Sequence, residues 1–471
     1  MFFKFTRKKN TISQPSADST IFGSGVNLVD SPNVIHQIAI DDKDLQRHMM
    51  VFGTTGVGKT RLCENLIEQH IRKGYSIVYF DPKGDQQIFT KIYDIAEQCG
   101  RGDELQLVTA IYPEYSAVVD PMAYYFMPDE LVSHIVSSIQ AGKEPFYRNI
   151  AKEITTAVIL GKLLISANEG KMPTFNIDEI RTSIRRESMV EMINTLLQIH
   201  DASLIDESQK VAGMLQDIVN SPQDYYVKVS ATLRTALMEL SSGNIGKIIG
   251  QADSNRFIRR LEEGKRVILV VHTGAMLTRE AASTLGRVLM SMIQSFIGRV
   301  YMSKRQVITP RLSVIIDECQ SVVYPGIEEI FSKGGSAGVM VTALCQSVNQ
   351  LYAGIGEELG KVILDNTNSK LFMRCTDAET AEYVLKHFGT HKVLTGVFSS
   401  NQVVSREVEE DLVKTIDVLD LKARQFYLTT YSGRWKGTTA DAADSKIEIE
   451  FPDAPALVTR VDTSRVLPQT P

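Results

Sequence analysis

Long apolar runs are missing from this 471-residue chain. The longest, such as Val267 to Val271, fall far short of the roughly 18 residues that a bilayer-crossing helix needs. The start, MFFKFTRKKN, is basic and shows no secretory signal. We therefore expect a cytoplasmic chain without a transmembrane segment, peripheral at the inner membrane only through partners.

A cysteine framework and an excess of basic charge are also missing. The five cysteines are odd in number and far apart, which predicts buried thiols in a reducing compartment rather than disulfides or metal ligands. The net charge of −5 argues against a protein coated with basic surface for tight, nonspecific binding of nucleic acid. A local basic channel remains compatible with this charge.

What the chain does have is an ordinary globular composition, with 43% hydrophobic and 23% charged residues, at a length typical of two or three structural units. Short β-rich runs recur with helical segments between them. This alternation predicts an α/β fold with a mainly parallel central sheet covered on both faces. The predicted strands are Met49 to Phe52, Ser76 to Phe80, Leu105 to Val108, Val267 to Val271, Leu312 to Ile316, Val339 to Leu344, Lys370 to Met373 and Phe426 to Thr430.

A phosphate-binding loop, GTTGVGKT, follows the first of these strands and precedes a helical pattern. Its glycines let backbone N–H groups turn towards phosphates, Lys59 reaches the β and γ oxygens, and the Thr60 hydroxyl suits Mg²⁺. We therefore predict binding of ATP with Mg²⁺. The predicted nucleotide-binding residues are Gly53, Thr54, Thr55, Gly56, Val57, Gly58, Lys59, Thr60 and Arg61.

A second motif, SVIIDECQ, ends a short apolar strand in Asp317 and Glu318. In a phosphate-loop enzyme the strand beside the loop ends in a carboxylate that reaches the Mg²⁺ shell, and Asp317 fits that role. Glu318 is then placed to polarise the attacking water as a general base. The pair predicts an ATPase that turns over rather than a switch that only binds.

A third strand ends at Gln346, in VMVTALCQSVNQ. An amide at the tip of a strand next to the catalytic strand is suited to contact the γ-phosphate or its water, which makes Gln346 a sensor candidate. The alternative is that Gln346 simply caps its strand.

Between the strands lies a long stretch in which apolar residues fall at helical spacing, with almost no strand-like run. It predicts an inserted all-α domain at residues 128–263, within a nucleotide-binding motor domain formed by residues 21–127 and 264–451. Residues 1–20 are expected to form a basic and polar arm, and residues 452–471 a proline-containing tail.

These motifs occur together, in order, with DPKGD at Asp81 to Asp85 and NTNSKLFMRCTDAETAEY at Asn366 to Tyr383. The combination resembles the type IV secretion coupling proteins, the TraD-type conjugative ATPases related to the FtsK and HerA DNA pumps. The resemblance runs from about Ile21 to Phe451. It implies a RecA-like motor, a homo-hexameric ring, and ATP-driven pumping of DNA with its bound relaxase through a central channel towards a type IV secretion membrane complex.

The resemblance gives phosphate binding to Gly53 through Thr60, Mg²⁺ and water activation to Asp317 and Glu318, and sensing to Gln346. For Asp81 and Lys83, the residues leave two readings: a carboxylate near Mg²⁺, or only a tight turn.

Two departures from the family pattern stand out. Many members carry an arginine in a GR-type turn proposed to reach a neighbour's ATP, whereas this turn reads SKGGSAG. Arg374, directly after a predicted strand, is our candidate for that trans-acting arginine, with a salt bridge to Asp377 or Glu379 as the alternative and Arg406 as second candidate. The membrane helices with which many members begin are not seen, so the anchor is on another chain, outside this sequence, or not needed.

Three functions stay open at this point. The first is a DNA-translocating coupling ATPase that delivers relaxase-bound DNA or protein. The second is a HerA- or FtsK-type DNA pump, or a secretion ATPase that drives assembly. The third is a nucleotide-gated adaptor that recruits substrates with little turnover.

Overall fold

The computed structural model describes residues 17–139, 145–173, 175–250, 252–276, 279–399 and 402–451, and within them the side chains of all residues except 145, 229 and 394–406. Most of the predicted N-terminal arm and the whole predicted tail therefore lie outside the described residues. Within the described part, no helix is both long enough and apolar enough to span a bilayer.

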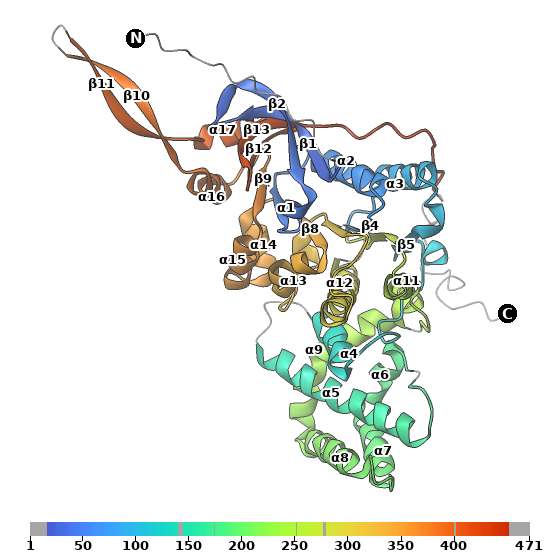
Figure 1. The fold of residues 1–471 in the computed structure, drawn as a ribbon. Coiled ribbons are helices and arrows are strands. Elements are labelled where there is room, and N and C mark those ends of the chain that lie inside the picture. Colours follow the sequence, from blue (N-terminus) through green and yellow to red (C-terminus); the bar gives the residue numbers. More distant parts are fainter. Residues whose placement is uncertain are drawn as a thin grey trace, which may run out of the picture.

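The core of the molecule is an 11-stranded sheet in the order β2-β1-β13-β12-β9-β3-β8-β7-β4-β6-β5 (Figure 1). Strands from β9 to β5 in this order run parallel, so the α/β prediction and every predicted strand are confirmed. The parallel strands are β3 (Met49–Phe52), β4 (Ser76–Asp81), β5 (Leu105–Thr109), β6 (Ile268–His272), β7 (Leu312–Ile316), β8 (Val339–Cys345) and β9 (Ser369–Phe372).

Alternate residues of each parallel strand enter two separate cores, because successive side chains of a strand point to opposite faces. In β3, Met49 and Val51 pack with helices α2 (Lys59–Arg72) and α3 (Gln86–Gln98). Met50 and Phe52 face the other side, where α12 (Arg279–Met302), α14 (Val348–Ile355) and α16 (Ala378–Phe388) lie. Burial on both faces explains why these strands read as continuous apolar runs.

One expectation about strand order was wrong. We expected the strand of Asp317 to lie beside the phosphate loop, but β8 separates β7 from β3. Sequence order cannot reveal this, because parallel strands are joined by crossovers that carry the chain past its neighbours. As a result, the strand that ends before Gln346 lies between the other two motifs.

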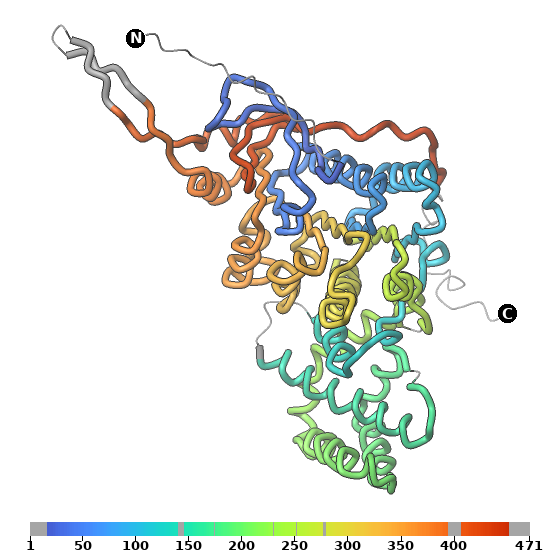
Figure 2. The backbone as a smooth tube through the Cα atoms, viewed as in Figure 1, coloured from blue at the N-terminus to red at the C-terminus, as the bar shows by residue number. Residues whose placement is uncertain are grey.

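The predicted helical insertion lies on one side of the sheet (Figures 1 and 2). Apart from one bridging residue, Asn255, the described part of residues 128–263 contains no β-strand. Its core is continuous with the motor core: His134 Nδ1 lies 3.0 Å from Ser291 Oγ of α12. Its elements are α4 (Pro128–Ser137), α5 (Pro145–Asn168), α6 (Ile177–Ser183), α7 (Arg186–Leu197), α8 (Ile205–Asn220), α9 (Gln223–Ser241), α10 (Gly243–Ile245), η3 (Gly246–Gly250) and α11 (Arg256–Glu262).

An antiparallel edge made of β2 (Ser31–Asp41), β1 (Ser19–Asn27), β13 (Gly433–Thr439) and β12 (Gln425–Thr430) completes the sheet. Of these strands, only β12 was predicted. A Cβ atom on Gly23 would stand 1.9 Å from the carbonyl oxygen of Thr438, and one on Gly25 would stand 2.1 Å from that of Lys436. This close approach of β1 to β13 requires glycine, and glycine weakens the strand signal in the sequence.

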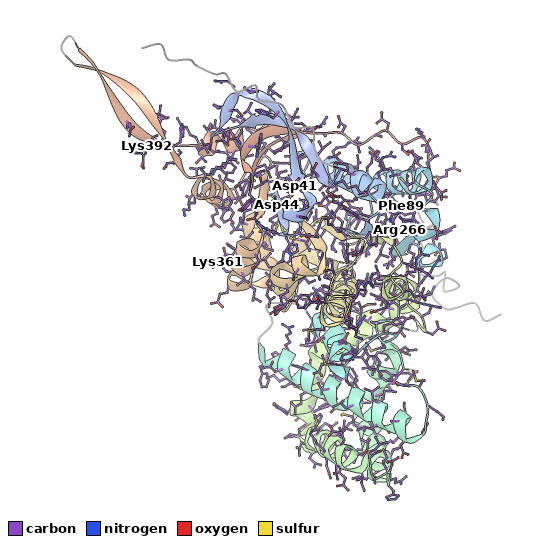
Figure 3. All side chains as sticks on the ribbon, in the orientation of Figure 1. Asp41, Asp44, Phe89, Arg266, Lys361 and Lys392 are labelled. Carbon is purple, nitrogen blue, oxygen red and sulfur yellow. The ribbon has the colours of Figure 1, made fainter. Side chains whose placement is uncertain are left out.

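Two further features border the sheet. A hairpin of β10 (Thr390–Ser399) and β11 (Gln402–Asp411) projects from the body, and its strands pair with each other (Figure 1). After β13, an extended segment, residues 440–451, follows α2 and α3, where Lys446 N donates to Asp94 Oδ2 at 2.7 Å and Phe451 packs on Phe89, which is labelled in Figure 3.

The remaining short elements lie in the motor. They are α1 (Asp42–Leu45), η1 (Gly102–Glu104), η2 (Pro113–Tyr115), η4 (Cys319–Ser321), α13 (Glu328–Lys333), η5 (Gly334–Ala337), α15 (Glu357–Asn366) and α17 (Thr415–Leu419).

Candidate functional site

The phosphate-binding motif has the expected setting of strand, loop and helix. β3 ends at Phe52 and α2 begins at Lys59, so the loop's backbone leads directly into a helix N-terminus. Gly56 and Gly58 have φ values of 76° and 103°, in the region that glycine adopts without a steric penalty. The loop can therefore take the tight turn that a phosphate cradle needs.

Lys59 is buried and folds back over its own loop. Its Nζ donates to the carbonyl oxygens of Gly53 at 2.5 Å and Thr54 at 3.0 Å. Burial lowers the pKa of Lys59, and the nearby Asp317 carboxylate opposes that shift. The ammonium thus lies within the loop and close to the acidic strand end, as the motif predicts.

Asp317 and Glu318 follow β7 at the same edge of the sheet. Asp317 is 2% exposed, and its Oδ1 accepts a hydrogen bond from Glu318 N at 3.0 Å. Burial raises the pKa of Asp317, against the effect of the neighbouring Lys83 cation. Glu318 has φ 50° and ψ 59°, a left-handed conformation that is uncommon for residues other than glycine and concentrates at functional sites. The structure thus brings Lys59, Asp317 and Glu318 together.

The DPKGD segment turns tightly beside these carboxylates. Both oxygens of the buried Asp81 are used by the turn: Oδ1 accepts from Lys83 N at 2.9 Å and Oδ2 from Asp85 N at 2.6 Å. Lys83 Nζ then reaches Glu318 Oε1 at 3.1 Å and Asp317 Oδ2 at 3.6 Å. The tight turn is present and places the Lys83 ammonium beside the acidic pair, while the Asp81 carboxylate is close enough to help raise the pKa of Asp317.

Gln346 directly follows β8 and is half-buried, and its Oε1 accepts from Gln350 Nε2 at 3.2 Å. Cys319 and Cys345, which are neighbours in sequence of Glu318 and Gln346, place their sulfur atoms 2.6 Å apart. All five cysteines are free thiols and four are buried, with Cys99 half-buried. The prediction of free, mostly buried thiols is therefore confirmed.

Arg374 follows β9, the strand on the other side of β3. Its side chain is exposed, and its carbonyl oxygen accepts a hydrogen bond from Thr54 N at 2.9 Å. Among the described residues, no ion pair joins Arg374 to Asp377 or Glu379, and Asp377 instead caps α16 by accepting from Thr380 N. The side chain of Arg406, the second candidate, lies outside the described residues.

Arg424 was not predicted, although it supports the phosphate loop. Its backbone N donates to Val57 O at 2.7 Å, and a Cβ on Gly58 would stand 3.1 Å from Arg424 Cγ. Its guanidinium contacts Asp441 Oδ1 at 2.7 Å. Arg424 has φ 72°, a second left-handed residue at this site. No sequence signal marks it, since it lies in a turn far along the chain from the loop.

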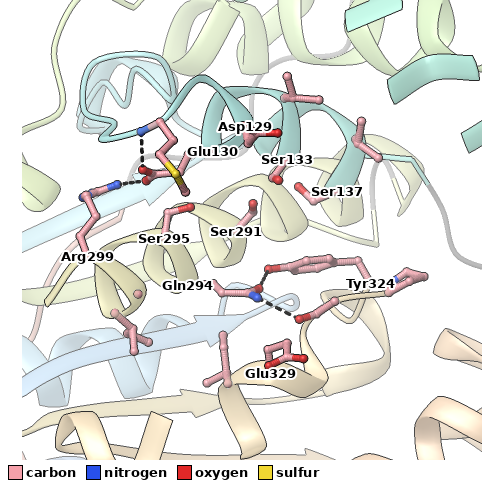
Figure 4. Close-up of a pocket in the computed structure, with 18 of the residues that line it drawn as sticks. Asp129, Glu130, Ser133, Ser137, Ser291, Gln294, Ser295, Arg299, Tyr324 and Glu329 are labelled. Atoms are coloured by element: carbon pink, nitrogen blue, oxygen red, sulfur yellow. Dashed lines mark hydrogen bonds and ion pairs between the residues drawn. The ribbon is translucent and has the colours of Figure 1, made fainter. Parts of the chain in front are cut away.

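A separate cavity of about 1130 Å³ lies between the insertion and the motor, on the face of the sheet opposite α2 and α3 (Figure 4). Residues of α4, α5, α12 and α13 line it, and Gln294 bridges its floor by accepting from the Tyr324 hydroxyl and donating to Gly326 O. None of the predicted site residues lines this cavity.

Comparison with known proteins identifies the chain's relatives. Residues 4–411, most of the chain, match the family described as type IV secretory system conjugative DNA transfer. The chain belongs to this family. The resemblance predicted from the motifs is thereby confirmed, and the site is that of a conjugative DNA transfer protein with a phosphate-loop NTPase fold.

Other members and related structures share this fold at low sequence identity. The unbound conjugative coupling protein TrwBdeltaN70 has a TM-score of 0.62 at 17% identity, over 88% of this chain and 89% of that one. The plasmid coupling protein TrwB in complex with ADP and Mg²⁺ has a TM-score of 0.58 at 19% sequence identity, and the match covers 86% of this chain and 88% of that one. VirB4 of Thermoanaerobacter pseudethanolicus has a TM-score of 0.53 at 11% sequence identity, and the match covers 91% of this chain and 98% of that one.

A local sequence match links this family member to the type 4 coupling protein DotL of Legionella pneumophila. The two are 34% identical over 65 residues, which make up 14% of this chain and 8% of DotL.

Proposed function

We propose that this chain is an ATP-driven, DNA-translocating coupling protein that delivers relaxase-bound DNA or protein substrates to a type IV secretion channel. The observation that carries the proposal is the meeting of Lys59, Asp317 and Glu318 at one edge of the sheet in a conjugative DNA transfer protein. In open α/β sheets, ligands bind at the carboxyl ends of the strands.

In the proposed reaction, Lys59 leaves the loop carbonyls and pairs with the β and γ oxygens of ATP. Thr60 and Asp317 supply the hydroxyl and carboxylate oxygens that suit Mg²⁺, which when bound neutralises charge on the phosphates. Glu318 orients water and takes up its proton, while Gln346 senses the γ-phosphate. Arg374 stabilises charge in the transition state. The remaining loop residues, Gly53 through Gly58, and Arg61 complete the nucleotide cradle.

We further propose the division of the chain into a motor, residues 21–127 and 264–451, and an all-α domain, residues 128–263, with flanking segments 1–20 and 452–471. Six motors are proposed to form a ring around DNA, since a few basic residues per subunit, repeated by symmetry, suffice to line a channel. The relaxase and the membrane complex of the secretion system are the proposed partners.

The test is ATP hydrolysis by the purified chain, with and without single- and double-stranded DNA, over a range of protein concentrations. We expect turnover that DNA stimulates, that rises cooperatively with concentration, and that Glu318→Gln reduces by a factor of about 10² or more. Glu358→Gln, on the exposed surface of α15, is the matched control and should retain wild-type turnover.

Two other results would redirect the proposal. Turnover that DNA does not change would point to a motor with another cargo, such as a secretion-assembly ATPase. Tight ATP binding without turnover under all these conditions would favour the nucleotide-gated adaptor.

A further inference from the structure

Lys83 lies beside the two carboxylates of the site, Asp317 and Glu318, yet it belongs neither to the phosphate loop nor to the strand that carries them. Its Nζ is 3.1 Å from Glu318 Oε1 and 3.6 Å from Asp317 Oδ2. Among the described residues, no other cationic side chain comes within 4.0 Å of either carboxylate. Lys59, the expected partner, is held on its own loop carbonyls.

The backbone around Lys83 is fixed, which separates it from an ordinary surface lysine. Asp81, 1% exposed, accepts the backbone N–H of Lys83 and of Asp85. Ala275 N donates to Pro82 O at 2.8 Å, and Gly84, at φ 75°, completes the turn. Because the backbone of the turn is fixed, the Lys83 side chain starts from a set position beside the two carboxylates, and only its own side-chain entropy is lost when the ion pair forms.

Glu318 has a fixed backbone, and its carboxylate is directed at Lys83. Its backbone is fixed by the N–H bond to Asp317 Oδ1 and by Ser321, whose N and Oγ both donate to Glu318 O. Its side chain is 22% exposed, and among the described residues Lys83 is the cation within 4.0 Å of its carboxylate. The turn after β4 therefore sets where the Glu318 oxygens point.

We propose that Lys83 is a built-in counter-ion for the Asp317–Glu318 pair: it positions the Glu318 carboxylate and competes with a divalent cation for the two carboxylates. The positioning role rests on the proposed ATPase function, whereas the competition concerns cation binding alone. Two cations within a few ångströms of the same carboxylate repel each other, so occupation by Lys83 weakens the attraction for Mg²⁺.

The first test needs no turnover. It measures the free Mg²⁺ concentration that half-saturates binding of a fluorescent, non-hydrolysable ATP analogue. Lys83→Met and Lys83→Gln should lower this concentration about three- to tenfold, because the competing charge is gone. Lys83→Arg, which keeps the charge, should stay within about twofold of wild type. Lys83 is 39% exposed on its side chain, so these variants are expected to fold, which a melting curve would check.

Lys361→Met is the matched control. Lys361 lies on α15, labelled in Figure 3, and makes an exposed ion pair with Glu357. The Lys361→Met variant should have the same half-saturating Mg²⁺ concentration as wild type. An unchanged or higher half-saturating Mg²⁺ concentration in both Lys83→Met and Lys83→Gln would overturn the competition.

The second test measures steady-state hydrolysis. Lys83→Met should lower kcat at least about tenfold with the KM for ATP within twofold, and Lys83→Arg should recover part of the loss. A tenfold rise in KM with unchanged kcat would make Lys83 a phosphate ligand and overturn the positioning role. Wild-type protein without turnover would contradict the proposed function but not the counter-ion, provided that the Mg²⁺ shift is seen.

Discussion

Thr54 in the phosphate loop donates its backbone N–H to the carbonyl oxygen of Arg374, at 2.9 Å. This bond ties the end of β9 to the nucleotide cradle of the same chain. The sequence assigned Arg374 to a neighbour's nucleotide, and that assignment stays a prediction. The bond fixes the backbone of Arg374, whereas its side chain is exposed, so a test must separate action on a neighbour's nucleotide from action on its own.

We expect Arg374→Ala to lower kcat by a factor of about 10³ or more, because a guanidinium that stabilises transition-state charge is lost. Mixing Arg374→Ala with Glu318→Gln protein distinguishes the two geometries. If Arg374 serves its own chain, mixed assemblies stay as inactive as each variant alone. Recovery of turnover in the mixture would establish action across a subunit interface.

Gly58→Ala should weaken ATP binding at least about tenfold. The φ of 103° is strained for alanine, and the new Cβ would stand 3.1 Å from Arg424 Cγ, so the loop must shift. Equilibrium binding of a fluorescent ATP analogue measures the effect. Gly213→Ala is the control: this glycine is exposed within α8 with open space around it, and alanine there should stabilise the fold by about 0.5–1 kcal/mol. Equal ATP affinity in the two variants would contradict the geometry of the loop.

Arg424→Ala should raise the Kd for ATP several-fold, since the variant loses the ion pair with Asp441 and the guanidinium bonds to Thr439 that hold this turn beside the loop. The melting temperature should change little, because the backbone bond from residue 424 to Val57 O does not need the side chain. Titration calorimetry with ATP provides the measurement. Arg259→Ala, at an exposed site on α11, should bind ATP like wild type.

Asp120 gives a prediction about pH. Burial raises the pKa of Asp120 to about 7, although the Met122 N–H bond acts in the opposite direction. Between its ordinary pKa of 3.8 and about 7, the folded chain holds a proton that the unfolded chain has lost, so this group's contribution to stability falls as pH rises through that window.

Asp120→Asn removes this titration while its amide oxygen still accepts from Met122 N. We expect its melting temperature to exceed that of wild type by more at pH 8 than at pH 5, with a difference on the order of 1–3 °C. Melting curves of both proteins in matched buffers check it. A gap of equal size at the two pH values would show that Asp120 is already ionised in the folded chain at pH 5.

The sequence predicted the parallel strands because each is buried on both faces and therefore apolar throughout, as in β7 and β8. It predicted Lys59, Asp317 and Glu318 because their spacing after strands is chemically constrained. It missed β1 and β13, where glycines replace the β-branched residues that mark a strand.

Contacts between distant parts of the chain could not be predicted from the sequence. The Arg424 support of the loop and the position of β8 between β3 and β7 both depend on how strands order themselves in space. The reach of Lys83 to Glu318 likewise depends on β4 and β7 being neighbours, which no local pattern encodes.

The bridge between Val119 and Asn255 has a consequence for how such proteins diverge. The chain leaves the motor and returns to it close to this bridge, where Asn255 Nδ2 also donates a hydrogen bond to the carbonyl oxygen of Asp120. Because the two ends of the insertion are already joined here, the helices that pack chiefly on one another, such as α7 and α8, can change in length without moving a strand. These helices can therefore differ between members of the family while the sheet and the phosphate loop keep their geometry.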